Sequence, residues 1–242
     1  LALSAVRMGL RSVIIIEKPS ELALITEQAR KTGVRPLLGM RIKLASIASG
    51  KWQSSGGEKS KFGLTSGQAL EAIRSLREAG LLDCLQMMHV HLGSQMSNIR
   101  DIRNGIGEAA RFYAELCRAG APLCAVDVGG GLGVDYEGTR TRSDCSVNYD
   151  MGDYATSIVE AFAEICRQYD LPHPDLLSES GRALTAHHAL LITNVTEVDV
   201  RDKRVPAAGK HESGPAAARR QLLERLDGDA SIGELFPEVQ HV

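Results

Sequence analysis

The sequence predicts an α/β fold with a parallel sheet, forming part of a (β/α)8 TIM-like barrel. Two observations support this prediction: short apolar segments alternate with segments of helical periodicity, and polar or glycine residues follow the apolar segments. Five such units do not close an eight-stranded barrel. The sequence also begins with Leu1 rather than methionine. We therefore expect a partial barrel, roughly its last five strand–helix units, taken from a longer protein.

The first apolar segment, SVIIIE at residues 12–17, is rich in β-branched residues and is typical of a buried strand. Comparable runs predict four more strands. The five expected strands are residues 12–17, 35–44, 84–92, 123–128 and 175–179. A further extended segment is expected at residues 188–200.

Segments of helical spacing separate these strands. The second of them is expected to begin at a cap on Thr65 or Ser66 and to end at Gly80, and the third ends at Gly120. The expected helices are residues 19–31, 66–79, 98–119 and 150–169. Long polar loops at residues 45–63 and 129–148 complete the pattern.

The composition changes towards the C-terminus. Residues 205–220 (VPAAGKHESGPAAARR) are rich in proline, glycine and alanine and poor in large apolar residues. Residues 221–226 are expected to form one or two helical turns. We therefore expect two regions: residues 1–200 as the barrel domain, and residues 201–242 as a linker and poorly ordered tail.

Composition and charge exclude several classes of protein. Hydrophobic residues make up 43% and charged residues 24% of the 242 residues, which is ordinary for a globular protein. Aromatic residues make up only 4% and the net charge is −2, so we expect no nucleic-acid partner. No apolar run is long enough to span a membrane. Five dispersed cysteines without CxxC spacing predict reduced thiols and a cytoplasmic protein.

Residues that can bind ligands or take part in a reaction follow three of the expected strands. His91, Ser94 and Gln95 follow the third strand. The glycines 129–131 follow the fourth, and Glu179 and Arg182 follow the fifth. The carboxyl ends of parallel strands meet at one rim, where α/β folds bind ligands. The sequence therefore predicts one site at this rim.

The glycine triplet predicts a phosphate site. Because Gly129, Gly130 and Gly131 lack Cβ atoms, their amides can turn towards one anion. Arg182 supplies a guanidinium that can grip a phosphate through paired N–H groups, and Ser94 supplies a hydroxyl. The alternative is a tight turn that simply needs glycine.

Glu179 lies on the same rim and suits a basic ring nitrogen, for instance that of pyridoxal phosphate. A carboxylate paired with the protonated nitrogen keeps such a ring an electron sink. The alternative is a structural ion pair between Glu179 and Arg182.

His89 and His91 lie two residues apart on a strand and share a face. One interpretation has His91 stacking on a planar cofactor ring, with His89 one layer deeper as a hydrogen-bonded core residue. The other, from a different class, is a metal-dependent barrel hydrolase in which both histidines bind zinc. His187, His188 or Asp127 would then complete the ligand set.

Three motifs in this order and spacing resemble a known family: HVHLGSQ at 89–95, DVGGGLGVDYEG at 127–138 and ESGRA at 179–183. They are similar to the fold-type III pyridoxal-phosphate decarboxylases, which have an alanine-racemase-like barrel and include the ornithine, diaminopimelate and arginine decarboxylases. SGKWQSSGGEKSKFGL at 49–64, YEGTRTRSDCSVNY at 136–149 and TAHH at 185–188 resemble the biosynthetic arginine decarboxylases in particular. The resemblance runs from about Leu1 to Val200 and fades beyond.

The resemblance implies a role for each matching residue. His91 corresponds to the histidine that stacks on the cofactor, and with Glu179 it is a candidate catalytic residue. The implied cofactor-binding residues are His91, Ser94, Gly129, Gly130, Gly131, Glu179 and Arg182. The implied substrate-binding residues are Asp127, Val128, Gly133, Asp135 and Tyr136. Arg41 and Lys61 match positions near the cofactor.

The implied activity is pyridoxal-phosphate-dependent decarboxylation of L-arginine to agmatine and CO2, in polyamine and spermidine biosynthesis. The family also implies magnesium, whose ligands the sequence does not identify, and a homo-oligomer with shared active sites. Diaminopimelate or ornithine decarboxylation is the alternative within the family. The family's Schiff-base lysine lies upstream of the matched region, and Lys18, Lys43 and Lys61 do not lie in its motif. We therefore expect the chain by itself to be inactive, or to be a non-catalytic cofactor-binding fragment.

Overall fold

The computed structural model describes residues 1–46, 60–186, 188, 194 and 196. Contacts divide the chain into two units, Leu1–His187 and His188–Val242, and almost all described residues belong to the first. The expectations for residues 188–200, 205–220 and 221–226, and for most of the loop at 45–63, therefore concern residues that lie largely or wholly outside the described part.

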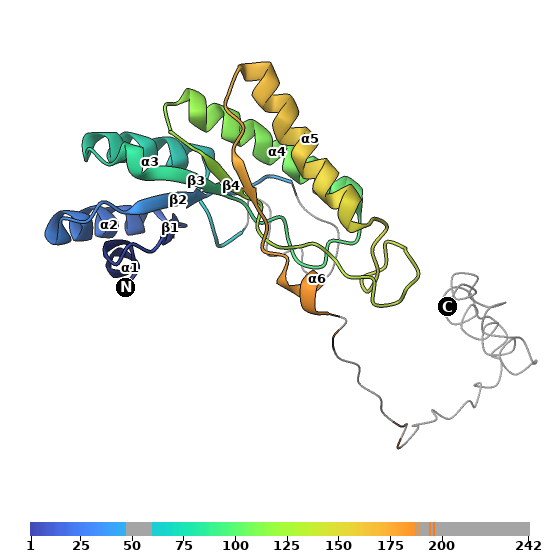
Figure 1. Ribbon diagram of the computed structural model, residues 1–242. Coiled ribbons are helices and arrows are strands. Elements are labelled where there is room, and N and C mark those ends of the chain that lie inside the picture. The colour runs from blue at the N-terminus through green and yellow to red at the C-terminus, as the bar shows by residue number, and fades with distance from the viewer. Residues whose placement is uncertain (47–59, 187, 189–193, 195, 197–242) are drawn as a thin grey trace, which may run out of the picture. The chain divides into compact units, whose positions relative to one another are not determined.

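A five-stranded, fully parallel sheet forms the centre of the first unit (Figure 1). Its strands lie in chain order: β1 Val13–Ile16, β2 Leu37–Arg41, β3 Leu85–His89, β4 Ala125–Asp127 and β5 Asp175–Leu177. Within the described residues, β1 and β5 each pair with one neighbour only. The predicted α/β fold with a parallel sheet is confirmed.

Helices connect the strands, as the βαβ pattern requires. They are α1 Ala2–Arg7, α2 Pro19–Thr32, α3 Ser66–Glu78, α4 Ile99–Arg118, α5 Met151–Tyr169 and α6 Gly181–Thr185, with a 3-10 turn at Leu82–Cys84. Thr65 caps α3 by accepting the amide of Gln68, and Asp150 caps α5 by accepting that of Asp153. The four expected helices are present, whereas α1 and α6 were not predicted.

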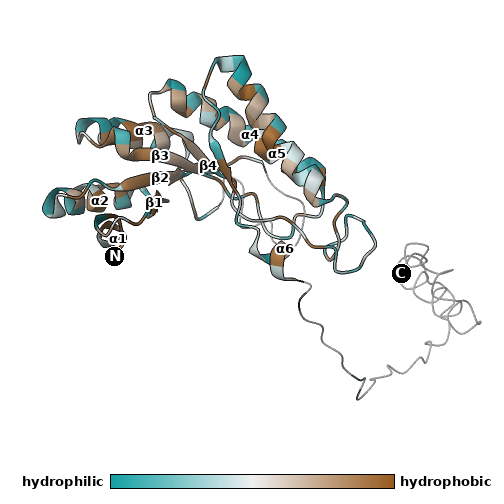
Figure 2. Ribbon diagram, viewed as in Figure 1, coloured by the Kyte–Doolittle hydropathy of each residue, from teal (hydrophilic) through white to brown (hydrophobic). Residues whose placement is uncertain are grey.

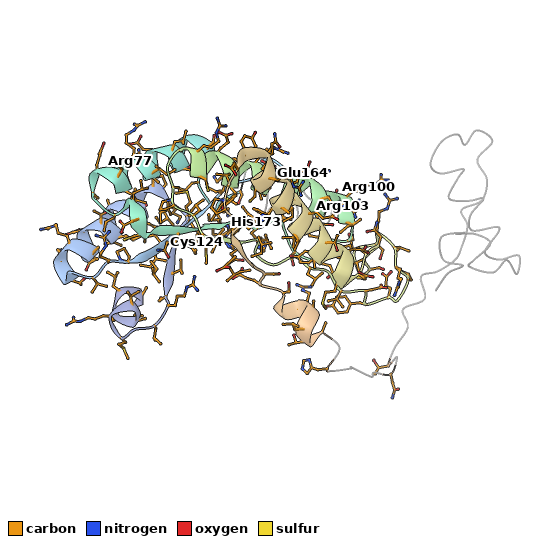
Figure 3. All side chains as sticks on the ribbon, turned by 45° about the horizontal axis from the view of Figure 1, so that its top comes forward. Arg77, Arg100, Arg103, Cys124, Glu164 and His173 are labelled. Atoms are coloured by element: carbon orange, nitrogen blue, oxygen red, sulfur yellow. The ribbon has the colours of Figure 1, made fainter. Side chains whose placement is uncertain are left out.

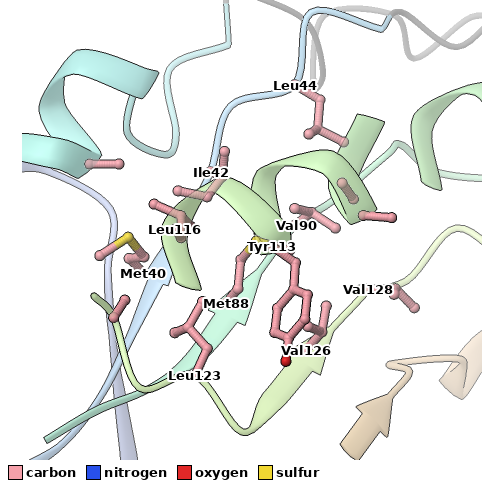
Figure 4. Close-up of a cluster of buried hydrophobic side chains, with 14 of the residues drawn as sticks. Met40, Ile42, Leu44, Met88, Val90, Tyr113, Leu116, Leu123, Val126 and Val128 are labelled. Atoms are coloured by element: carbon pink, nitrogen blue, oxygen red, sulfur yellow. The ribbon is translucent and has the colours of Figure 1, made fainter. Parts of the chain in front are cut away.

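Alternate strand residues pack against the helices. Met88, Val90, Val126 and Val128 lie in the same buried cluster as Tyr113 of α4 (Figure 4). Figure 2 shows the strands mainly in brown and the loop between β4 and α5 largely in teal, which agrees with this core. The remaining strand positions point to the opposite face of the sheet.

Helices α4 and α5 form the best-packed helix pair beside the sheet. The rings of Tyr113 and Phe162 meet edge to face, with centroids 6.0 Å apart. The Tyr113 hydroxyl donates to the carbonyl of Pro172 at 2.9 Å. Arg103, labelled in Figure 3, donates to Ser157 of α5. This packing fixes the helices that precede and follow β4, and so fixes the strand that ends in the glycine triplet.

All five strands are shorter than predicted, and β2 and β3 differ most at their carboxyl ends. The predicted strands at residues 35–44 and 84–92 end at Arg41 and His89. Beyond those points only single bonds extend the ladder, such as those from the Ile42 amide to His89 and from the Val90 amide to Asp127. In β2 and β3 the chain therefore leaves the sheet three residues earlier than its hydrophobicity suggests.

The described helices include none that combines the length and the apolar character needed to cross a bilayer. All five cysteines are free thiols.

Candidate active site

One row of charged and polar residues crosses the sheet where the strands end. Arg41 is in register with His89, and His89 with Asp127. The Glu17 carboxylate receives a hydrogen bond from Arg41 at 2.6 Å. His89 Nδ1 lies 3.0 Å from Asp127 Oδ2, and both side chains are largely buried. The row therefore consists of two linked pairs on the face away from the helices.

A second row, two residues further along, brings His91, Gly129 and Glu179 together. The Glu179 amide donates to the Gly129 carbonyl at 2.9 Å. Gly129 has φ +70°, and a Cβ atom there would lie 2.5 Å from the Val90 carbonyl and 3.0 Å from His91 Nδ1. Glycine is therefore required against the Val90 carbonyl and the His91 ring.

Arg182 and Ser94 approach each other from different strand ends. Arg182 lies in the first turn of α6, and its Nη2 donates to Ser94 Oγ at 3.3 Å. Helix α6 begins two residues after Glu179, so this short helix determines where the guanidinium lies.

The other two glycines of the triplet lie against the neighbouring loops. A Cβ atom on Gly130 would be 3.1 Å from the Glu179 carbonyl, and one on Gly131 would be 2.7 Å from the Gly93 carbonyl. Their amides donate no hydrogen bond to the described part of the chain, whereas the Gly129 amide donates to Asp127 Oδ1 at 2.8 Å. Two amides of the triplet, rather than three, are therefore available to an anion.

These groups fit the phosphate of a cofactor. A guanidinium, a hydroxyl and two amides without an acceptor among the described residues belong to three adjacent loops. Such groups are the usual ligands of a phosphate. Glu179 and His91 lie on the same rim, on either side of Gly129.

His91 is suited to contact a ring rather than an anion. Burial lowers the pKa of His91, and the positive charge of Arg41 and the neighbouring His89 lower it further, against the opposing effects of Glu179 and Asp127. The imidazole is therefore neutral near pH 7, and a neutral ring stacks on a planar cofactor without attracting its phosphate.

The zinc hypothesis relied on His89 and His91 acting together. Among the described residues, the group whose potential ligand atoms lie within 4.8 Å of one another consists of His89, Asp127 and Glu179, and it does not include His91. His89 Nδ1 and Asp127 Oδ2 already face each other in a hydrogen bond. The paired-histidine centre is not formed.

Comparison with known proteins identifies the family. The model of the family described as pyridoxal-dependent decarboxylase, pyridoxal binding domain, matches residues 3–186. The chain belongs to the pyridoxal-dependent decarboxylases. The resemblance drawn from the three motifs is confirmed.

Curated relatives of this decarboxylase domain align over all or most of the chain. A biosynthetic arginine decarboxylase of Xylella fastidiosa is 52% identical over 242 residues, which is 100% of this chain and 38% of the relative. One of Alkalilimnicola ehrlichii is 56% identical over 226 residues, covering 93% of this chain and 35% of the relative. The chain thus spans less than two fifths of these relatives. The first alignment includes the tail, whereas the family match ends at residue 186, so the expectation that the likeness fades beyond Val200 stays a prediction.

Solved structures agree with the fold. The biosynthetic arginine decarboxylase of Campylobacter jejuni superposes with a TM-score of 0.64 at 34% identity, covering 75% of this chain and 29% of that one. A diaminopimelate decarboxylase of Helicobacter pylori complexed with L-lysine gives 0.61 at 25% identity, covering 76% and 43%. The partial barrel of the alanine racemase type is confirmed for this decarboxylase domain.

The residues predicted to bind substrate do not share one environment. Asp127 is bonded to His89, and the Val128 side chain is buried in the core. The Gly133 amide donates to the Tyr149 hydroxyl at 2.9 Å. Tyr136 is exposed. These positions lie on or after β4, but they do not converge on one point through their side chains.

Asp135 organises its own loop. It accepts hydrogen bonds from the Ser146 hydroxyl at 2.6 Å and from the amides of Gly138 and Arg140. The Ser146 hydrogen bond, helped by these amides, holds the pKa of Asp135 below its usual value. Its carboxylate is therefore occupied within the loop after β4.

Two residues tie the loop after β3 to the loop after β4. Gln95, predicted at the rim after the third strand, exchanges hydrogen bonds with the backbone of Val134. Tyr149, which was not singled out from the sequence, donates its hydroxyl to the Met96 carbonyl at 2.6 Å. The partners of both residues are distant in sequence, so no local pattern predicted these bonds.

Proposed function

We propose that this decarboxylase domain provides the cofactor site of an arginine decarboxylase, which converts L-arginine to agmatine and CO2 in polyamine biosynthesis. The observation that carries the proposal is the hydrogen bond of Arg182 to Ser94, from loops adjacent to the one that holds Gly130 and Gly131. The amides of these two glycines have no acceptor among the described residues, and Glu179 lies next to them. A phosphate cradle beside an acid is what pyridoxal phosphate requires.

Each residue then has one role. Gly130, Gly131, Ser94 and Arg182 hold the phosphate, Glu179 keeps the ring nitrogen protonated, and His91 lies against the ring face. When bound, pyridoxal phosphate supplies the electron sink that accepts the electrons left by loss of CO2. Glu179 contributes to turnover because the charge that it stabilises develops during the reaction.

Arginine as the substrate is supported by the sequence identities with named arginine decarboxylases, 52% and 56%, against 25% with the diaminopimelate decarboxylase structure. Diaminopimelate and ornithine are the alternatives. Formation of agmatine from L-arginine, measured beside CO2 release from the other two amino acids, distinguishes these substrates. Cofactor binding without release of CO2 from any of them would leave only a binding role.

The proposal also covers the compartment, the assembly, the domain division and the metal. Five free thiols agree with a cytoplasmic protein, and the single-sided pairing of β1 and β5 leaves edges that a homo-oligomer or further chain can cover. A division near residue 200 is supported by the family match, which ends at residue 186. Magnesium is proposed from the family resemblance alone. Among the described residues, the cluster of His89, Asp127 and Glu179 does not support it, because it includes a nitrogen ligand and already contains a hydrogen bond.

The cofactor site is tested by titrating the chain with pyridoxal phosphate and following absorbance. Arg182→Ala should weaken binding roughly tenfold or more, because a guanidinium–phosphate contact is lost, and Arg182→Lys should not restore it. Glu179→Gln should leave phosphate binding nearly unchanged but lower turnover by orders of magnitude in an active enzyme that contains this domain. Unchanged affinity in Arg182→Ala would exclude the proposed cradle, and unaltered turnover in Glu179→Gln would exclude the ring-nitrogen role.

A further inference from the structure

Asp127 has both carboxylate oxygens engaged beneath the glycine triplet. Oδ1 accepts the amide of Gly129 at 2.8 Å, and Oδ2 lies 3.0 Å from His89 Nδ1. The Asp127 side chain is 13% exposed and that of His89 is 9% exposed. One carboxylate therefore links the end of β3 to the first residue of the loop after β4.

This geometry sets the direction of the loop. The bond from a carboxylate to the amide two residues later closes a tight turn. It also satisfies a buried donor, because Gly129 is buried and its amide has no other acceptor in the described part of the chain. Gly129 then takes φ +70°, and the amides of Gly130 and Gly131 follow, neither with an acceptor within the part of the chain that the structure describes.

We propose that Asp127 is a positioning residue of the phosphate cradle and does not touch the substrate. It fixes the turn at Gly129, and the turn aligns the amides of Gly130 and Gly131 beside Arg182. This inference rests on the proposed cofactor site and departs from the substrate-binding role that the family resemblance implies for Asp127. What the turn requires is an oxygen acceptor at Oδ1 rather than a negative charge.

The test compares pyridoxal phosphate with pyridoxal, which lacks the phosphate, in titrations of the full chain. The wild-type chain should prefer the phosphate ester. In Asp127→Ala this preference should fall roughly tenfold, which corresponds to about 1.4 kcal/mol. The affinity for pyridoxal should change little. Asp127→Asn should keep the preference within about twofold, because its amide oxygen still accepts the Gly129 amide and His89 can adopt the other tautomer. Asp175→Ala, at the far end of β5, is the matched control and should not change either affinity.

The outcomes separate the two proposals. A wild-type chain without a preference for the phosphate ester would overturn the cofactor site itself. A preference that survives in Asp127→Ala would overturn only the positioning role. If Asp127→Ala binds both ligands equally weakly, Asp127→Asn distinguishes the possibilities. A preference for the phosphate ester retained in Asp127→Asn supports the positioning role. Loss of that preference shows that the charge is needed and overturns the positioning role.

Discussion

Gly129 illustrates how one missing side chain shapes the site. Its φ is positive, and an added Cβ atom would clash with the Val90 carbonyl. Because backbone strain and the steric clash add, Gly129→Ala should reduce the free energy of unfolding by about 3 kcal/mol or more. Gly138 has φ +71° but open space around it, so Gly138→Ala should lose only about 1 kcal/mol. Urea denaturation of both variants measures the difference. Equal losses would show that the clash is absent.

His91 predicts how stability depends on pH. Its pKa is lowered from 6.5, mainly by burial, so below about pH 6.5 the unfolded chain binds this proton more readily than the folded chain. The His91 contribution should therefore be constant above that pH and become destabilising as the pH falls towards the lowered pKa. Urea midpoints between pH 5 and pH 8 should fall less steeply in acid for His91→Gln than for the wild type. Parallel curves would contradict the prediction.

Among the elements, the pairing of α4 with α5 depends on one buried ring. Phe162 is 1% exposed and meets Tyr113 edge to face, so Phe162→Ala should reduce the free energy of unfolding by about 3–5 kcal/mol. Val159 lies on the same helix and is 55% exposed, so Val159→Ala should change stability by less than about 0.5 kcal/mol. Chemical denaturation compares the two. A small loss in Phe162→Ala would mean that the helices repack.

The five strands and four long helices could be predicted because their patterns are local. Helices α1 and α6 were not predicted, because each has at most six residues and no side-chain cap. Neither contains a buried residue, so no hydrophobic periodicity indicated a helix. The predicted ends of β2 and β3 were too late because Ile42, Leu44 and Val90 are buried beyond the regular strands. Hydrophobicity reports burial, and at the rim burial continues after strand pairing stops.

The location of the candidate site could be predicted from the sequence, but its hydrogen bonds could not. Parallel strands put His91, Gly129 and Glu179 at one rim, so their order in the sequence was sufficient. The bond from Asp127 to His89 depends on the register of two strands. The hydrogen bond from Ser146 to Asp135 depends on how the loop after β4 folds back on itself. Neither leaves a local pattern in the sequence.

At the scale of the whole unit, the edges of the sheet carry exposed apolar residues. Leu177 on β5 is 43% exposed, and β5 pairs only with β4 among the described strands. Exposed apolar edges promote association, so Leu177→Lys should lower the concentration-dependent light scattering of the chain. Leu70→Lys, at a residue 50% exposed on α3 away from the edges, is the control and should have a smaller effect. Equal effects would point to general solubility instead.

Along β3 and β4, successive residues alternate between the hydrophobic core and the rim. Met88, Val90, Val126 and Val128 pack in the core, while His89, His91, Asp127 and Gly129, one residue away in each case, line the rim. Core positions contribute through packing, whereas at the rim side chains such as His89 and Asp127 contribute through hydrogen bonds and Gly129 through its backbone conformation. A residue such as Asp127 or Gly129 is therefore under constraint from the shape of the rim as well as from stability.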